Sequence, residues 1–202
     1  MPGAEVHLLW KILDAVHSDK GLSLLPTARF ADCSRLDVIC VPGGPGQVDL
    51  MDDEVTLEFI RRIAENCRLI TSVCTGSLVL GAAGLLTGYR ATCHWNSIDQ
   101  LEWFGAKAVH ERVVCDRNRI TGAGVTSGID LALTIAGDLL GHSVAEEISL
   151  QMEYDPEPPY RTGSPRIAPA ELVETVQNRI ADFMERRRLA SERASRRLDR
   201  KQ

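Results

Sequence analysis

The stretch Arg68-Leu-Ile-Thr-Ser-Val-Cys74-Thr-Gly-Ser-Leu-Val-Leu-Gly-Ala-Ala-Gly84 decides the fold. It starts as a β-type run, and the residues that follow Cys74 are small and apolar with helical character. Continuous apolar strands followed by helices are typical of a parallel sheet that is covered on both faces. Cys74 is then either a small core residue or a nucleophile held on the sharp turn between a strand and a helix.

The same alternation extends in both directions along the chain. Strand candidates lie at residues 4–10, 36–41, 68–73, 112–116 and 119–124, and helical stretches lie at residues 54–66, 75–84, 96–105, 128–141 and 144–153. This order predicts an α/β protein, a three-layer sandwich with a mostly parallel sheet. Four prolines in residues 155–165 predict a crossing loop, and a last amphipathic helix is expected from about Pro169. Ser127 and Asp130 have the spacing of a capping box.

Composition narrows the class of protein. The chain has 202 residues, 44% of them hydrophobic and 25% charged, so we expect one domain over residues 1–202. The net charge of −5 provides no surplus of positive charge for binding nucleic acid. The one basic run, residues 185–202, is interpreted as a solvated helix end rather than a nucleic-acid arm. Without a long apolar run or a signal-peptide pattern, the sequence predicts a cytoplasmic protein that does not bind membranes.

The six cysteines form no Cys-x-x-Cys pair, which indicates reduced thiols rather than disulfides or a zinc site. Four of them lie in or beside strand runs and are predicted to be small core residues: Cys40, Cys67, Cys93 and Cys115. Cys74 differs because it falls at the carboxyl edge of the sheet, where open α/β folds bind their ligands. The positive end of the following helix would favour its thiolate, the nucleophilic form.

A second candidate element is the loop Val41-Pro-Gly-Gly-Pro-Gly46, directly after the strand run 36–41. Gly43 and Gly44 permit a backbone that turns its amides toward a ligand, so the N–H groups of Gly44 and Thr75 form a candidate oxyanion hole. An ordinary turn would use the same residues. His94 follows a short strand and is interpreted as a pocket residue without a proton-transfer role, with a hydrogen-bonded core histidine as the alternative.

Five motifs together carry a resemblance to a known family: CVPGGPG (40–46), SVCTGSLVLGAAGLLTG (72–88), ATCHW (91–95), ITGAGVTSGIDLAL (120–133) and LQMEYDPEPPYRTGSP (150–165). From about Ala4 to Phe183 the chain resembles the ThiJ/PfpI branch of the class I glutamine amidotransferase-like superfamily, and within it the isonitrile hydratases (isocyanide hydratases). The resemblance implies a flavodoxin-like fold, a homodimer, and no metal or organic cofactor.

It also implies that an isonitrile is hydrated to an N-substituted formamide through a covalent thioimidate. Cys74 would be the nucleophile, and Thr75 would orient or stabilise the intermediate through its hydroxyl and its amide.

The chain departs from this family pattern at its start. Members of the branch begin with a further strand and helix that carry an acidic residue near the cysteine, and this chain starts at what resembles their second strand. The resemblance therefore implies a sheet that lacks an interior strand, a true start upstream of Met1 or a fragment, and poor stability with weak hydratase activity in this form. Asp49, Asp52 and Glu147 could replace the acid, but helix-start or surface roles are favoured for them.

Rival functions are separated by single residues. A glutaminase of this superfamily carries His-x-Glu after the cysteine, which none of the five histidines supplies, and the peptidase relatives carry histidine at the position of Thr75. A regulator would add a helix-turn-helix region about as large as a domain, for which the chain is too short. Glyoxalase-like activity and redox sensing through oxidation of Cys74 remain as alternatives.

Overall fold

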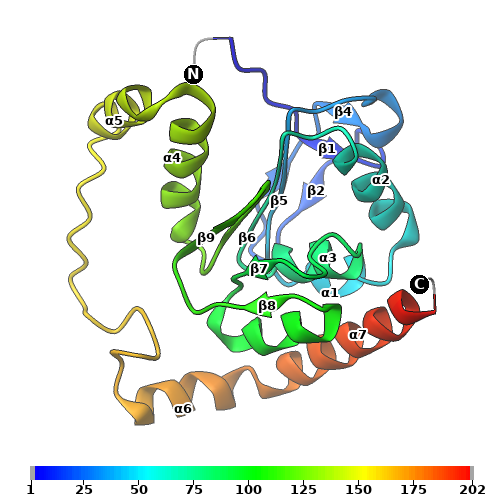
Figure 1. Ribbon diagram of the computed structural model, residues 1–202. Coiled ribbons are helices and arrows are strands. Elements are labelled where there is room, and N and C mark those ends of the chain that lie inside the picture. Colours follow the sequence, from blue (N-terminus) through cyan, green and yellow to red (C-terminus); the bar gives the residue numbers. More distant parts are fainter. Residues whose placement is uncertain (1–2, 201–202) are drawn as a thin grey trace.

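A four-stranded sheet forms the centre of the computed structural model, which describes residues 3–200 (Figure 1). Its order is β5 (Val38–Val41), β6 (Leu69–Val73), β10 (Arg119–Gly122) and β9 (Val113–Asp116). The first three strands are parallel, and β9 runs antiparallel to β10 because a tight turn containing Arg117, with φ 55°, joins them. The predicted mostly parallel sheet is confirmed, with one antiparallel edge.

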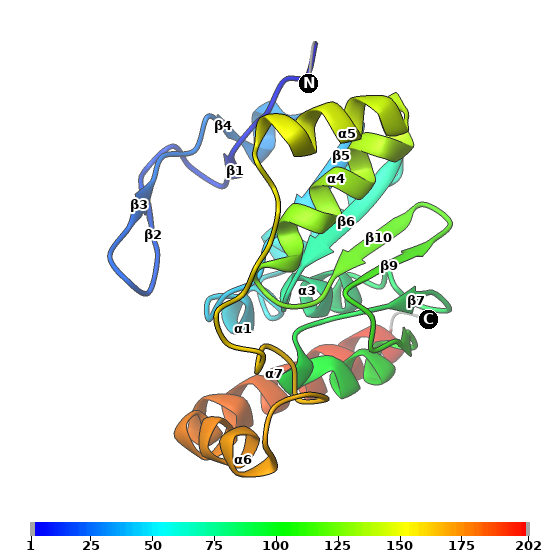
Figure 2. The same ribbon diagram turned by 90° about the vertical axis from the view of Figure 1, so that its left-hand side faces the viewer.

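The sheet separates two apolar clusters, as a strand buried on both faces requires. Leu69 of β6 packs with Ile120, Leu131 and Ile135, whereas its neighbour Ile70 belongs to the larger cluster on the opposite face. The helix α4 (Ser127–Leu140) covers the first face, and α2 (Glu54–Ala64) and α3 (Gly76–Ala82) cover the second (Figure 1); Figure 2 shows α4 in front of the strands. The predicted flavodoxin-like three-layer α/β/α sandwich is confirmed.

The remaining elements surround this sandwich. They are β1 (Leu9–Trp10), β2 (Val16–His17), β3 (Ser23–Leu24), β4 (Ala28–Arg29), η1 (Phe30–Asp32), α1 (Gln47–Leu50), β7 (Arg90–Ala91), η2 (Trp95–Phe104), β8 (Lys107–Ala108), α5 (His142–Gln151), α6 (Ala170–Arg179) and α7 (Ala181–Asp199). The segment expected to be helical at residues 96–105 is the 3-10 helix η2. Residues 155–165 form a loop as predicted, and α6 begins directly after Pro169.

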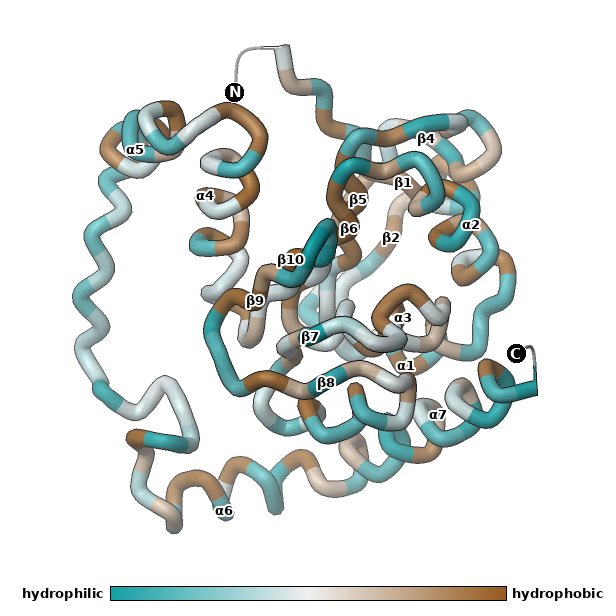
Figure 3. The backbone as a smooth tube through the Cα atoms, in the orientation of Figure 1, coloured by the Kyte–Doolittle hydropathy of each residue, from teal (hydrophilic) through white to brown (hydrophobic). Residues whose placement is uncertain are grey.

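The amino-terminal segment is less regular than the sequence indicates. The strand predicted at residues 4–10 is reduced to β1, which pairs with β4, while β5 is an edge strand in the described part of the chain. Most of this segment packs loosely, and Val6 is 78% exposed. Its contact with the core is made further along, where Phe30 stacks on Phe59 of α2 with ring centroids 4.1 Å apart. In the described residues, β5 is thus an unpaired edge of a main sheet whose strands are strongly hydrophobic (Figure 3).

Two of the four cysteines predicted to be core residues are exposed. Cys67 and Cys93 are buried as expected, but Cys40 and Cys115 are exposed. The physical reason is that β5 and β9 are the two edge strands, so the face on which each of these thiols lies is incompletely covered. All six thiols are free.

Asp130 does not cap the helix α4. The N-cap residue is Thr126, no side-chain cap bond is formed there, and Ser127 Oγ donates to the carbonyl of Gly124 at 2.6 Å. The Asp130 carboxylate instead accepts from Arg112 Nε at 2.6 Å and from the Tyr154 hydroxyl at 3.0 Å. The capping-box prediction is therefore wrong, because tertiary partners take the carboxylate.

The basic carboxyl-terminal helix is docked on the core, so the predicted solvated helix end is wrong. Ala190 and Ala194 of α7 are almost completely buried, and Ser191 Oγ donates to Gln100 Oε1 at 2.7 Å. At the end of α1, Asp52 accepts hydrogen bonds of 2.6 Å from both Arg193 and Arg197. Small residues at helical spacing allow this close packing, and residues 201–202 lie outside the described part.

Replacing Asp52 by Asn should loosen the attachment of α7. Burial raises the pKa of the Asp52 carboxyl, but the hydrogen bonds and charges of Arg193 and Arg197 lower it by more, so its net pKa lies below the ordinary 3.8. The contribution of the ionised Asp52 carboxylate to the free energy of unfolding is therefore present above about pH 4 and is lost as the pH falls further. Because these pairs are partly solvent-screened, we expect Asp52→Asn to lower the free energy of unfolding by about 1 kcal/mol at pH 7.

Urea denaturation at pH 7 and at lower pH measures this difference. Glu146→Gln, at an exposed position on α5, is the control and should change the free energy of unfolding by less than about 0.5 kcal/mol. An equal effect of the two substitutions at pH 7 would contradict the assignment.

Candidate active site

Cys74 lies on a strained turn between β6 and α3. Its φ of 58° places it in the left-handed region, which non-glycine residues rarely adopt and which costs about 1–2 kcal/mol. Its amide donates to the carbonyl of Gly122 on β10 at 2.9 Å, and its side chain is half-buried. This is the geometry of a nucleophile elbow, which presents a side chain at the carboxyl edge of the sheet.

The glycine loop after β5 is pressed against this turn. A Cβ at Gly43 would lie 2.8 Å from the Cβ of Cys74 and 2.8 Å from the amide nitrogen of Thr75. At Gly76, the first residue of α3, a Cβ would lie 2.0 Å from the carbonyl oxygen of Val41. Only glycine fits at either position, so the loop and the start of the helix are locked together.

Thr75 connects the elbow to the loop by hydrogen bonds. It is 2% exposed, and its hydroxyl accepts from the Gly44 amide at 3.1 Å and lies 3.5 Å from the Gly44 carbonyl oxygen. The structure thus brings Cys74, Thr75, Gly43 and Gly44 together, as the sequence predicts. The Gly44 amide is engaged with Thr75, so binding an oxyanion there requires an exchange of this bond, and the oxyanion hole stays a prediction.

His94 follows β7 and is half-buried. Its Nδ1 accepts from the amide of Asn96 at 3.3 Å, and its Cδ2 would lie 3.9 Å from a Cβ at Gly124. Burial, and secondarily the positive charge of Arg187, lower the pKa of His94, which favours the neutral ring near pH 7. A neutral ring held by the backbone is compatible with the predicted supporting role, which stays a prediction.

Sequence reasoning missed Arg187, which α7 inserts beside this segment. The guanidinium is buried, which lowers its pKa, and it donates to Ser97 Oγ at 3.0 Å. The signal that could have found it is the spacing of Arg187, Ala190, Ser191 and Ala194, which places a stripe of small residues and one arginine on a single helix face.

Three carboxylates were candidates to replace the acidic residue that the family resemblance implies near Cys74, and in the described chain none of them is bonded to the elbow. Asp52 is paired with two arginines of α7, while Asp49 on α1 and Glu147 on α5 are exposed. In the described residues, no hydrogen bond joins any of them to Cys74 or Thr75.

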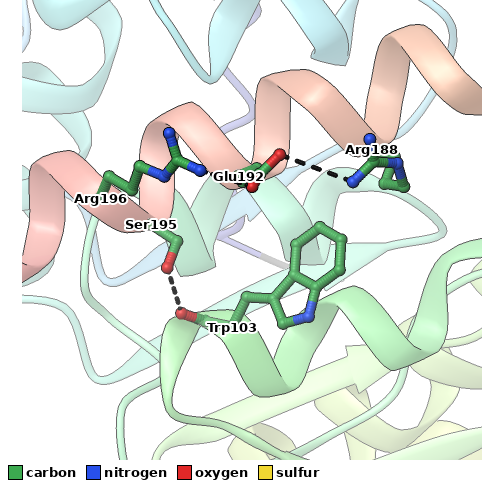
Figure 4. A pocket seen from close by; sticks show the side chains of 5 residues that line it. All are labelled: Trp103, Arg188, Glu192, Ser195 and Arg196. Atoms are coloured by element: carbon green, nitrogen blue, oxygen red, sulfur yellow. Dashed lines mark hydrogen bonds and ion pairs between the residues drawn. The ribbon is translucent and has the colours of Figure 1, made fainter.

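A surface pocket of about 360 Å³ lies between η2 and α7 (Figure 4). Its lining consists of Trp103, Arg188, Glu192, Ser195 and Arg196. Glu192 lies 3.5 Å from Arg188 and 2.7 Å from Arg196, and Ser195 Oγ donates to the Trp103 carbonyl at 2.7 Å. None of the predicted site residues lines this pocket, and its charges are already paired.

Two further features of residues 3–200 bear on the site. No group of three or more His, Cys, Asp or Glu residues is arranged to hold a metal ion. Within the same range, no helix combines the length and the apolar composition that crossing a membrane requires.

Gly43→Ala should disturb the elbow, whereas Gly46→Ala should not. The added methyl at position 43 would overlap Cys74 and Thr75, but a Cβ at Gly46 meets no atom within 4 Å and its φ of −62° suits alanine. We expect Gly43→Ala to slow alkylation of Cys74 by iodoacetamide about tenfold or more, since small displacements of a reacting group have large effects. Quantitative mass spectrometry measures the rate, and equal rates in the two variants would contradict the close approach.

The comparisons with known proteins agree with this geometry. Residues 2–137 match the DJ-1/PfpI family. The chain is 52% identical to an isonitrile hydratase of Pseudomonas putida over 98% of this chain and 87% of that protein. It is 30% identical to a glutathione-independent glyoxalase of Caenorhabditis elegans over 69% of this chain and 75% of the relative.

Among solved structures, a ThiJ/PfpI family protein from Pseudomonas syringae superimposes with a TM-score of 0.91 and 44% identity, covering 94% of this chain and 79% of that one. Fold, elbow and sequence matches lead to one assignment: the chain belongs to the DJ-1/PfpI family.

Proposed function

We propose that this protein hydrates isonitriles to N-substituted formamides, with Cys74 as the nucleophile. The observation that carries the proposal is the strained elbow that holds Cys74 half-exposed at the start of α3. Identity of 52% with an isonitrile hydratase over nearly the whole chain supports this substrate class. No other cysteine of the described chain lies at a junction between a strand of the main sheet and the helix that follows it.

The reaction is an addition of water without oxidation or reduction. The thiolate of Cys74 attacks the terminal carbon of R–N≡C and forms a C–S bond, and that carbon takes up a proton to give the thioimidate R–N=CH–S. Water then adds to the same carbon while the nitrogen is protonated. The hydroxyl of this adduct loses its proton as the C–S bond breaks, which releases R–NH–CHO, returns the thiolate and replaces the proton taken up in the first step, so the sum consumes one isonitrile and one water.

The neighbours of Cys74 have supporting roles in this proposal. The Thr75 hydroxyl, already bonded to Gly44, orients the adduct, and the amides of Thr75 and Gly44 stabilise charge that develops during addition. Gly43 supports this arrangement because, without a side chain, it lets the loop lie directly against Cys74 and Thr75. In this proposal, His94 contributes shape beside the bound substrate rather than a proton.

Cys74→Ala should abolish formamide production from a small alkyl isonitrile, because the covalent intermediate cannot form. Thr75→Val should lower kcat about tenfold to 100-fold through loss of the hydroxyl, whereas Thr75→Ser, which keeps it, should retain most of the activity. Chromatographic measurement of the formamide tests both expectations. Undiminished turnover in Cys74→Ala would exclude this cysteine as the nucleophile.

A glyoxalase-like activity is the second candidate, because a relative of that class is 30% identical over most of its length. It would convert an α-dicarbonyl and water to a hydroxy acid with the same cysteine. Supplying either substrate to the unmodified protein separates the two activities by their products, a formamide or a hydroxy acid.

Redox sensing is a third possibility, since Cys74 is a half-exposed thiol at a helix start. Selective oxidation of Cys74 by mild peroxide, without turnover of either substrate, would favour it.

We also propose a homodimer in the cytoplasm. The free state of all six cysteines supports a reducing compartment. The helix α5 has no fully buried residue, and α5 and the segment that follows it carry large exposed hydrophobic side chains: Leu150 (83%), Met152 (54%), Tyr160 (80%) and Ile167 (63%). Exposed apolar side chains of this kind suit contact with a second copy.

Leu150→Glu should therefore convert the dimer to a monomer, because burying a charge in the subunit contact is unfavourable. Val55→Glu, at a position on α2 that is also exposed (61%), is the matched control and should leave the dimer intact. Light scattering gives the mass of each variant, and a dimeric Leu150→Glu protein would place the interface elsewhere.

A further inference from the structure

The pocket between η2 and α7 (Figure 4) has no part in the proposed reaction. Its volume of about 360 Å³ lies at the low end of the range for small-molecule sites, which is about 300–1,000 Å³. Within the described chain, its lining includes no residue of the elbow or of the glycine loop. A molecule bound in this pocket is therefore separate from the substrate at Cys74.

Trp103 forms the aromatic wall of the pocket. Because η2 is a 3-10 helix, residues three apart share a face, and Leu101 and Phe104 are both buried in the core. Trp103 lies off this face and is 39% exposed. Ser195 Oγ donates to the Trp103 carbonyl at 2.7 Å, which fixes the backbone that carries the indole. A partly exposed indole on a fixed backbone offers a flat surface on which an aromatic ring can stack.

A row of charged side chains on α7 forms the opposite wall (Figure 4). Arg188, Glu192 and Arg196 follow one another at intervals of four residues, so they share one face of the helix. The lining thus holds two positive charges and one negative charge. An organic cation would be repelled by both arginines, whereas an anion is attracted.

The two arginines are not equally free to bind an anion. Arg188 donates to both carboxylate oxygens of Glu185, at 2.7 Å and 2.8 Å. Arg196 donates one hydrogen bond of 2.7 Å to Glu192, and its side chain is 69% exposed. A guanidinium has five N–H donors, so Arg196 keeps donors for a second carboxylate. Exposed ion pairs contribute little stability, so Glu192 can share Arg196 with a ligand at little cost.

We propose that this pocket binds an aromatic carboxylate. Its ring system, of one or two rings, stacks on the indole of Trp103, and its carboxylate accepts hydrogen bonds from Arg196. The planar guanidinium matches a carboxylate, and the two contacts come from facing elements, so the ligand needs both an aromatic body and a negative charge. Glu192 limits the affinity because it competes for the same guanidinium. Binding here does not depend on the chemistry at Cys74.

An NMR titration with 2-naphthoate tests the location of the site, because the chain has three tryptophans whose indole N–H signals report binding. We expect the signal of Trp103, identified by its loss in Trp103→Leu, to shift more than those of Trp10 and Trp95. The uncharged analogue 2-naphthamide has the same rings and should bind more weakly by about fivefold or more, since it lacks the charge that Arg196 binds.

Calorimetry with 2-naphthoate separates the contributions of the side chains. Arg196→Gln should weaken binding about fivefold or more, and Trp103→Leu about tenfold, whereas Trp103→Phe keeps an aromatic ring and most of the affinity. Glu192→Gln should have the opposite effect, with binding about threefold tighter, because it removes the competing carboxylate. Arg186→Gln is the matched control: it removes an exposed arginine of α7 that does not line the pocket, and should leave the affinity unchanged.

A Trp103 signal that does not move at millimolar 2-naphthoate would overturn the proposal. Equal affinities for 2-naphthoate and its amide, or equal affinities of Arg196→Gln and Arg186→Gln, would do the same. Arg196 is exposed, so its variant keeps this test available where Trp103→Leu does not fold, and Trp103→Phe then identifies the signal. Isonitrile turnover is not measured, so failure of the proposed function leaves each of these outcomes unchanged.

Discussion

The turn at Cys74 is the constraint on which the rest of the structure depends. A non-glycine residue at φ 58° persists only where its surroundings hold it, and here three neighbours do so. The Cys74 amide is bonded to Gly122, the Gly43 backbone touches the side chain, and the start of α3 at Gly76 lies against the Val41 carbonyl. Strand β6 must therefore lie between β5 and β10, which supply these contacts.

Burial of the sheet on both faces gives this turn a rigid support. Alternate residues of β6 enter the two apolar clusters, so the strand cannot shift register without exposing one of them. Buried hydroxyls reinforce the junction: Ser72 and Ser77 lie 2.8 Å apart across the turn, and Ser77 Oγ donates to the Thr92 carbonyl at 2.7 Å. These bonds tie the elbow to the segment that carries Cys93 and His94, so the sulfur and its neighbours are fixed together.

The carboxyl-terminal helix packs against η2 from the opposite end of the chain. Its small residues bring α7 close to η2, and this approach carries Arg187 into the interior while Asp52 holds the exposed side. The packing of one amphipathic helix therefore both stabilises the fold and contributes a buried positive charge. Four arginines of the same helix pair with glutamates or with Asp52, namely Arg188, Arg193, Arg196 and Arg197, whereas Arg187 is buried.

The sequence by itself determined the order of strands and helices, the parallel sheet, and the elbow with its glycine loop. These features depend on hydrophobic periodicity and on residues that are adjacent in the chain, such as Val73, Cys74 and Thr75. Only the tertiary structure decided the exposure of Cys40 and Cys115, the partners of Asp130, and the burial of Arg187. Each of these depends on contacts between residues that are distant in sequence. Such contacts decide which strands become edge strands, which arginine reaches a carboxylate, and which face of a helix packs against the core.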